Sequence, residues 1–180
     1  MKDAMKDARA LKGFPPVSKP NARVLILGSM PGVESLNQSR YYAHAQNRFW
    51  PIMGELVGAL PSLPYRQRLQ RLSSAGIALW DVLETCERPG SLDSAILDHS
   101  AQANDFSAFL SAHRRIRTML FNGAKAESSF QRSVLPTLDA FELDYRRLPS
   151  TSPANASQNP AFKLAAWREA LLAAGATLTT

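Results

Sequence analysis

One short apolar run constrains the fold of this chain more than any other feature. Residues 23–27 read Arg-Val-Leu-Ile-Leu, and the run ends at Gly28. A short, continuously apolar segment of this kind is typical of a strand that is buried on both faces. Similar runs recur at residues 76–80, 116–121 and 141–145. The sequence therefore predicts four strands.

Stretches with helical patterns lie between and after these strands. The last has the clearest boundaries, because Asn159 suits an N-cap, Pro160 a first helical residue and Gly175 a C-terminal cap. The expected helices cover residues 49–60, 65–73, 105–113, 124–134 and 161–174. Alternating strands and helices imply a parallel sheet with helices on both faces. We therefore expect an α/β fold, with a single three-layer α/β/α domain around a central, mostly parallel four-stranded sheet.

The start of the chain differs in composition from the rest. Residues 1–20 carry a short Met-Lys-Asp-Ala duplication and then three prolines, which suits an arm better than a core element. The whole chain of 180 residues is 45% hydrophobic and fits one domain better than two. We therefore expect a flexible N-terminal arm at residues 1–20 and one domain at residues 21–180.

Composition also narrows the class of protein. No run approaches the roughly 18 apolar residues that span a bilayer, and the first residues are too charged for a secretory signal. The single Cys86 and three histidines offer no spacing for a metal site. We expect a cytoplasmic, monomeric protein that uses no metal and no membrane. The net charge of +6 favours a polyanionic partner such as DNA.

The polar segments that follow the four strands are the candidate site, because ligands bind outside the carboxyl ends of parallel strands. These segments are residues 28–32, 81–90, 122–125 and 148–157. The first, Gly-Ser-Met-Pro-Gly, would bring backbone N–H groups close to a ligand. It does not match the phosphate-binding patterns of nucleotide cofactors, so we expect no such cofactor.

An unusual block at residues 41–50 reads Tyr-Tyr-Ala-His-Ala-Gln-Asn-Arg-Phe-Trp. It holds four of the fifteen aromatic residues of the chain beside an amide, an imidazole and a guanidinium. Flat rings next to hydrogen-bonding groups suit a pocket for a flat polar ligand such as a nucleobase. Aromatic residues also fill cores, so the block alone leaves both interpretations open.

Together, three blocks resemble the motifs of the uracil-DNA glycosylase superfamily, and they are most similar to its hypoxanthine-DNA glycosylase branch. They are residues 28–32, residues 42–50 and the Leu-Pro-Ser-Thr-Ser-Pro-Ala-Asn segment at residues 148–155. The resemblance implies a DNA glycosylase for base-excision repair, which flips a deaminated base out of damaged DNA and hydrolyses its N-glycosidic bond. Hypoxanthine is the favoured base. No lysine is placed to form a Schiff base, so we expect a monofunctional enzyme without a cofactor.

The resemblance also implies a catalytic residue. Mismatch-specific uracil-DNA glycosylases carry an Asn in the first motif that positions the hydrolytic water, but this chain has Met30 there, and a thioether cannot hold water. The hypoxanthine branch is similar in using an Asn of the second block, which makes Asn47 the expected catalytic residue. Asn47 could instead cap the helix that follows it.

The expected base-binding residues are Gly28, Ser29, Met30, Tyr42 and Asp81. By resemblance, Tyr42 stacks on the flipped base, and Asp81 stands where uracil-specific enzymes carry an Asn that reads the base edge. An ionised carboxylate only accepts hydrogen bonds, which suits the N1–H of hypoxanthine. Asp81 could equally cap a turn or pair with Arg88.

The expected DNA-backbone residues are Ser150, Thr151, Ser152, Asn155 and Lys125. The three hydroxyl residues lie in a segment that resembles the loop with which relatives compress the DNA backbone, and such groups can hold phosphates without reading sequence. Asn155 could insert into the gap left by the base. Lys125 follows the third strand, where phosphate binding and plain helix capping are equally reasonable.

Three alternative functions remain open from the sequence. The nearest is a uracil-specific or mismatch-specific glycosylase of the same superfamily. A non-catalytic protein that binds damaged DNA would explain the loss of the first-motif Asn at Met30. A hydrolase of free nucleosides would not need the positive net charge.

Overall fold

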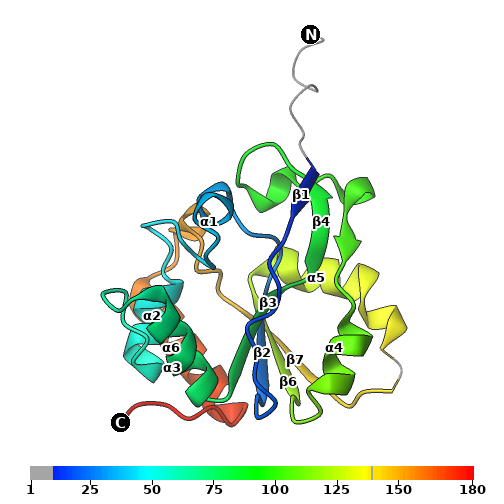
Figure 1. The fold of residues 1–180 in the computed structure, drawn as a ribbon. Helices are drawn as coiled ribbons and strands as arrows, with labels where there is room; N and C mark the ends of the chain where they lie inside the picture. The colour runs from blue at the N-terminus through cyan, green and yellow to red at the C-terminus, as the bar shows by residue number, and fades with distance from the viewer. Residues whose placement is uncertain (1–9, 139) are drawn as a thin grey trace.

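A four-stranded parallel sheet forms the centre of the protein, as Figure 1 shows for the computed structural model, which describes residues 10–138 and 140–180. Its strand order is β3-β2-β6-β7. The strands are β2 (Val24–Gly28), β3 (Ile77–Asp81), β6 (Thr118–Asn122) and β7 (Asp144–Leu148). Every residue of β2 and β3 is buried, as the continuous apolar runs predicted. The expected α/β fold around a parallel four-stranded sheet is confirmed.

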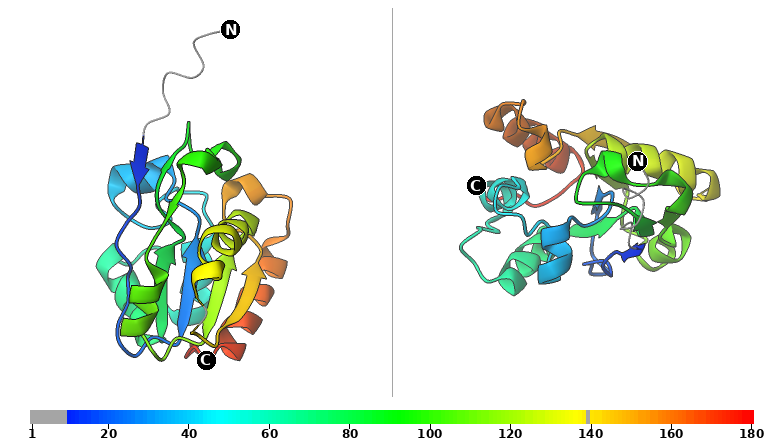
Figure 2. Two further views of the ribbon diagram at one scale, coloured as in Figure 1. Left: turned by 90° about the vertical axis from the view of Figure 1, so that its right-hand side faces the viewer. Right: turned by 90° about the horizontal axis from the view of Figure 1, so that it is seen from above.

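Helices cover both faces of this sheet (Figures 1 and 2). They are α2 (Phe49–Val57), α3 (Tyr65–Ser74), α4 (Phe106–Ala112), α5 (Ala124–Ser133) and α6 (Pro160–Ala173), whereas α1 (Val33–Gln38) lies beyond the carboxyl ends of the strands (Figure 1). Alternate residues of β2 point to opposite faces. Leu25 and Leu27 pack in the core cluster that contains α4 and α5, whereas Val24 and Ile26 pack in the cluster that contains α2, α3 and α6.

The register of the parallel strands aligns their carboxyl ends. Gly28 at the end of β2 pairs with Asp81 at the end of β3, and Asn122 at the end of β6 pairs with Leu148 at the end of β7. The loops that follow these four residues therefore begin at one edge of the sheet. Sequence motifs that lie more than 100 positions apart meet there.

A second, three-stranded antiparallel sheet was not predicted. Its strands are β1 (Ala10–Lys12), β4 (Leu83–Glu87) and β5 (Gln102–Ala103), in the order β1-β4-β5. Because β4 begins two residues after β3 ends, the segment 81–90 is mostly strand rather than loop. Short 3-10 helices follow at Asp93–Ala95, labelled η1, and at Asp98–Ser100, labelled η2.

Residues 10–20, which we expected to belong to a flexible arm, instead lie against the domain. Leu11 in β1 pairs with Cys86 in β4, and Val17 forms a bridge with Leu79 in β3. The indole Nε1 of Trp80 donates a hydrogen bond of 3.1 Å to the Phe14 carbonyl. The prolines of this segment are compatible with such pairing at a sheet edge. The remainder of the expected arm, residues 1–9, lies outside the described residues.

The predicted boundaries of α6 are confirmed. The Asn159 side chain accepts a hydrogen bond from the Ala161 N–H, Pro160 is the first helical residue, and Gly175 adopts a φ of 81° just beyond the last turn. In residues 10–138 and 140–180, no helix combines the length and the apolar character that crossing a membrane requires.

The contact between Gly28 and Asp81 generates a test of the strand-end geometry. A Cβ atom on Gly28 would overlap Asp81 Oδ1 and lie 3.2 Å from the Tyr42 hydroxyl. Both neighbours are buried in the pocket wall, so we expect Gly28→Ala to lower the free energy of unfolding by about 1–3 kcal/mol, as overpacking does. Urea denaturation of the two proteins measures this difference.

Gly32→Ala is the matched control, because it makes the same change four residues later in the same turn. A Cβ there would meet nothing closer than Ser91 Oγ at 3.8 Å, and the φ of −69° suits any residue. We expect its unfolding free energy to stay within about 0.5 kcal/mol of the parent. Equal losses in both variants would contradict the assigned overlap.

Candidate active site

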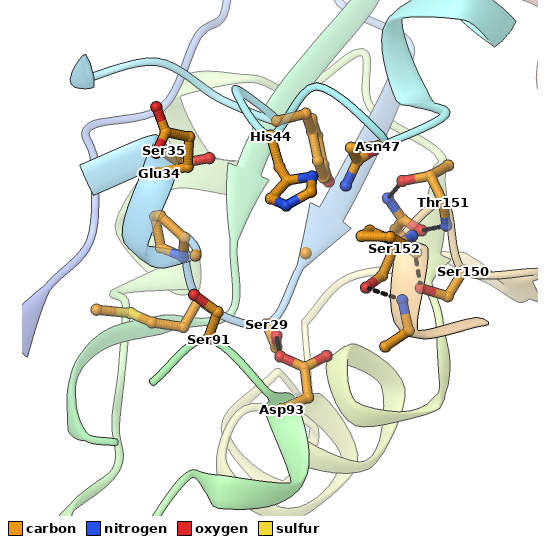
Figure 3. Close-up of a pocket in the computed structure, with 18 of the residues that line it drawn as sticks. Ser29, Glu34, Ser35, His44, Asn47, Ser91, Asp93, Ser150, Thr151 and Ser152 are labelled. Carbon is orange, nitrogen blue, oxygen red and sulfur yellow. Dashed lines mark hydrogen bonds between the residues drawn. The ribbon is translucent and has the colours of Figure 1, made fainter. Parts of the chain in front are cut away.

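A pocket of about 510 Å³ opens at the carboxyl ends of the central strands (Figure 3). This volume lies in the range of small-molecule sites. Loops from the ends of β2, β3, β6 and β7 contribute to its wall, together with the aromatic block. Ten of the expected site residues line it: Asn47, Gly28, Ser29, Met30, Tyr42, Asp81, Ser150, Thr151, Ser152 and Asn155.

Lys125 is the expected site residue that does not line this pocket. Its ammonium group pairs with Asp98 Oδ1 at 2.7 Å, and Arg132 pairs with the other oxygen of the same carboxylate at 2.7 Å. The lysine is therefore already engaged by a carboxylate outside the pocket.

Tyr42 forms an aromatic wall of the pocket. Its ring stacks on Phe49 with centroids 4.0 Å apart and an interplanar angle of 24°. Phe49 is fully buried and contacts Trp50 and Trp167 edge-on, which fixes the stack from behind. Since Phe49 does not line the pocket, the face of Tyr42 that Phe49 leaves free is available to a ligand. Tyr42 also has a φ of 53°, a strained conformation of the kind that clusters at functional sites.

Asn47 both holds the start of α2 and faces the pocket. Its Oδ1 accepts a hydrogen bond of 2.9 Å from the Phe49 N–H. A backbone N–H requires an oxygen acceptor, so this bond fixes the orientation of the amide. The Nδ2 group is then left for the pocket, into which Figure 3 shows it pointing. Asn47 can therefore donate hydrogen bonds to a ligand or a water molecule there.

Asp81 lies at the floor of the pocket. Its side chain is 3% exposed, and its Oδ2 has no hydrogen-bond partner in the described part of the chain. Burial raises the pKa of the Asp81 carboxyl to about 7; the nearby Asp93 carboxylate adds to this rise and Arg88 opposes it. Near neutral pH the group is therefore present in both its protonated and its ionised form.

The alternative ion pair between Asp81 and Arg88 is not observed. The Arg88 guanidinium is 3% exposed and donates to three backbone carbonyls instead: Pro31 at 2.6 Å, Gly90 at 2.9 Å and Met30 at 3.5 Å. In a trans peptide the C=O and the following N–H point in opposite directions. Because Arg88 binds the Pro31 carbonyl, the Gly32 N–H of the same peptide points away from the guanidinium. Arg88, which the sequence analysis considered only as a partner for Asp81, shapes the 28–32 turn.

Thr151 anchors the serine-rich loop rather than facing DNA. Its N–H donates to Asn122 Oδ1, and Asn122 Nδ2 donates back to Thr151 Oγ1, both at 2.9 Å. Thr151 is fully buried. Its carbonyl accepts the Arg48 N–H at 2.9 Å, which joins this loop to the aromatic block. The sequence placed Asn122 in one of the four candidate strand-end segments but gave no indication that it holds the serine-rich loop.

The neighbouring serines remain available for hydrogen bonding. Ser150 Oγ accepts the Ser152 N–H, and Ser152 Oγ accepts the Ala154 N–H, both at 3.2 Å. Each hydroxyl keeps its own proton to donate. Asn155 is tied back instead, because its Nδ2 donates to Gln158 Oε1 at 3.1 Å and its carbonyl accepts from Lys163 Nζ at 2.7 Å.

A further carboxylate, for which no sequence pattern gave an indication, lines the pocket. Asp93, at the start of η1, accepts a hydrogen bond of 2.6 Å from Ser29 Oγ through its Oδ1. Removal from water raises the pKa of Asp93, while the Ser29 hydroxyl, Arg88 and Lys125 lower it. In residues 10–138 and 140–180, no three His, Cys, Asp or Glu side chains gather in a group that could hold a metal ion.

Comparisons with known proteins identify the family of this chain. Residues 15–173 match the family described as the uracil DNA glycosylase superfamily. The chain is 36% identical to the hypoxanthine DNA glycosylase of Methanosarcina barkeri over 160 residues, which cover 88% of this chain and 96% of the relative. It is 37% identical to the hypoxanthine DNA glycosylase of Methanosarcina acetivorans over 145 residues, which cover 80% and 87%.

A solved structure shows the same fold. The solution NMR structure of a protein from Methanosarcina acetivorans, provisionally named a uracil DNA glycosylase, superposes with a TM-score of 0.76 at 32% identity. The match covers 92% of this chain and 99% of that one. The chain belongs to the uracil DNA glycosylase superfamily.

Proposed function

We propose that this protein is a monofunctional DNA glycosylase that releases a deaminated base, with hypoxanthine favoured, in base-excision repair. One observation carries the proposal: a buried carboxyl without a partner lies at the floor of a pocket that has an aromatic wall and a free amide donor. The relatives named hypoxanthine DNA glycosylases support this choice of base.

Binding begins at the surface around the pocket. The net charge of +6 attracts the DNA backbone, and the free hydroxyl protons of Ser150 and Ser152 can bind phosphate oxygens. The target nucleotide then leaves the duplex, and its base enters the pocket beside Tyr42. We further propose that the protein acts as a monomer, on chromosomal DNA in the cytoplasm.

Asp81 is placed to read the edge of the base. When ionised, its two oxygens face the N1–H and the adjacent C2–H of hypoxanthine without conflict. Uracil flanks its N3–H with two carbonyl oxygens, and one of these would repel the second carboxylate oxygen. When protonated, the carboxyl can also donate to a carbonyl oxygen, which makes uracil more acceptable.

Cleavage separates charge between the sugar and the base. The departing base gains negative charge, and the Gly32 N–H, which the Arg88 contact turns away from the guanidinium, can stabilise it. The Asn47 amide donates to the attacking water and holds it near C1′. In the described chain, no lysine is among the residues that line the pocket, which supports hydrolysis without a Schiff base.

The assignment of Asn47 is tested with two variants. We expect Asn47→Ala to lower the single-turnover rate of hypoxanthine release by about 10²-fold or more, because the donor is lost. It also removes the bond to Phe49, so we expect a loss of about 1 kcal/mol in unfolding free energy. Base release is measured by cleaving the product strand at the abasic site and separating the fragments on a gel. Urea denaturation measures the change in unfolding free energy.

Asn47→Asp separates catalysis from the hydrogen bond that Asn47 accepts from Phe49. A carboxylate can still accept the Phe49 N–H, so stability is retained, but it cannot donate to water. We expect its release rate to fall as in Asn47→Ala while its unfolding free energy stays at the parent value. A parent-like rate in Asn47→Asp would refute the donor role.

The assignment of Asp81 predicts a pH-dependent choice of base. The pKa of Asp81 is raised to about 7, so raising the pH from about 6 to about 8 ionises the carboxyl. The ratio of the hypoxanthine rate to the uracil rate is therefore expected to rise over this interval. Single-turnover rates on two duplexes that differ only in the target base measure the ratio at each pH.

Asp81→Asn supplies the matched control for this measurement. An amide keeps the shape of the carboxyl but does not titrate, and it can donate to a uracil carbonyl oxygen. We expect the variant to prefer uracil more than the parent does, with a rate ratio that no longer changes between the two pH values. A pH-independent ratio in the parent would count against base reading by Asp81.

A further inference from the structure

We propose that Asp93, held by the Ser29 hydroxyl, is the general base that takes a proton from the attacking water. The inference rests on the proposed glycosylase function and adds a second catalytic group to it. The Ser29 Oγ donates to Asp93 Oδ1 at 2.6 Å, and both residues line the pocket. The carboxylate makes no other hydrogen bond or ion pair with the described residues, so Oδ2 is free to accept from a water molecule.

The position of Asp93 in the pocket suits attack on the sugar. Asp81 lies at the buried floor, where the flipped base is deepest, whereas Asp93 belongs to an exposed loop at the rim. The sugar lies between the base and the DNA backbone, and hence between floor and rim. Figure 3 shows Asp93 and Ser29 on one side of the pocket and Asn47 and His44 on the other. Asn47 can therefore bind water from one side of the cavity, and Asp93 faces the same cavity from the other.

The other polar side chains of the pocket are less suitable bases. Asn47 presents its donor, because its oxygen accepts from Phe49. Glu34 Oε1 accepts from Gln38 within α1. His44 Nδ1 accepts the Gln46 N–H at 3.1 Å. Glu34 also keeps one oxygen free, but its hydrogen bond to Gln38 is exposed on α1, whereas Asp93 is held by Ser29 of the 28–32 turn in a partly buried hydrogen bond.

The loop that carries Asp93 is fixed in place. Ser91 Oγ accepts the Val33 N–H at 2.9 Å, which ties the loop to the first turn of α1. Arg88, just before it, is buried against the 28–32 turn. A carboxylate at the mouth of a pocket for a polyanion opposes binding through like-charge repulsion, so a catalytic use accounts for its place there.

The proposed step conserves atoms and charge. As the N-glycosidic bond breaks, its electron pair leaves with the base, and the water oxygen forms a new bond to C1′. Asp93 takes one proton from this water, and the other stays as the new hydroxyl of the abasic sugar. The proton on Asp93 then neutralises the released base. The products are the free base and an abasic site.

Several charged or titratable groups surround Asp93 and set when it ionises. They are Arg88, Lys125, Asp81, Cys86, Tyr42 and, across the pocket, His44. Withdrawal from water raises the pKa of Asp93 above its usual range. The carboxylate can act as a base only after rising pH has ionised it.

The test compares single-turnover hypoxanthine release by the parent, Asp93→Asn and Ser29→Ala between about pH 5 and about pH 8. We expect Asp93→Asn to lose about 10²-fold in rate at neutral pH, while its affinity for DNA that carries an abasic-site analogue stays at the parent value or rises, because the like-charge repulsion is removed. The ratio of parent rate to variant rate should grow with pH, because only the parent gains a base; titration of Asp81 affects both proteins. Ser29→Ala keeps the carboxylate but frees it, so a smaller loss is expected.

Asp144→Asn is the matched control, because it neutralises an exposed carboxylate at the opposite end of β7. We expect it to keep the parent rate. Melting curves establish that all variants are folded. An Asp93→Asn rate within threefold of the parent, or a constant rate ratio across the pH range, overturns the role of Asp93 while leaving the glycosylase proposal intact. A parent protein that releases no hypoxanthine refutes both.

Discussion

The pairing of Gly28 with Asp81 at the ends of two adjacent parallel strands decides what the pocket can hold. Because glycine has no side chain, the Asp81 carboxyl can lie directly over its backbone, buried and with one oxygen unpartnered. A buried polar atom without a partner is costly, and such cost is tolerated where a ligand completes the hydrogen bond. The sheet register therefore places an unsatisfied group where a flipped base would arrive.

Two further contacts keep the walls of this pocket rigid. Arg88 binds backbone carbonyls of the 28–32 turn, and the reciprocal pair of Asn122 and Thr151 binds the serine-rich loop to the end of β6. Both use buried hydrogen bonds rather than exposed ion pairs, which water would weaken. Catalytic groups on loops need such support to stay within a fraction of an ångström of their working positions.

Much of the fold followed from local patterns, but the second sheet did not. Buried runs identified β2, β3 and β6 because nearly every side chain in them is apolar. The strand-end rule then located eight of the ten expected site residues that line the pocket, and the aromatic block supplied the other two, Tyr42 and Asn47. The edge strand β7 reads Asp-Tyr-Arg-Arg-Leu and is largely exposed, so its position was predicted three residues too early. Asp93 could not be predicted, because its approach to Ser29 depends on β4 pairing with β1 and β5, whose short sequences carry no clear period.

The segment before the central sheet helps to hold the aromatic ring on which the base is expected to stack. The Tyr41 hydroxyl donates to the Pro15 carbonyl at 3.0 Å, while the Tyr41 N–H donates to Tyr65 and its carbonyl accepts from Trp50. Three hydrogen bonds thus hold Tyr41 immediately before Tyr42, and one of them comes from the stretch whose composition predicted a flexible arm. Trimming the chain to its glycosylase motifs would remove a brace of the ring on which the base is expected to lie.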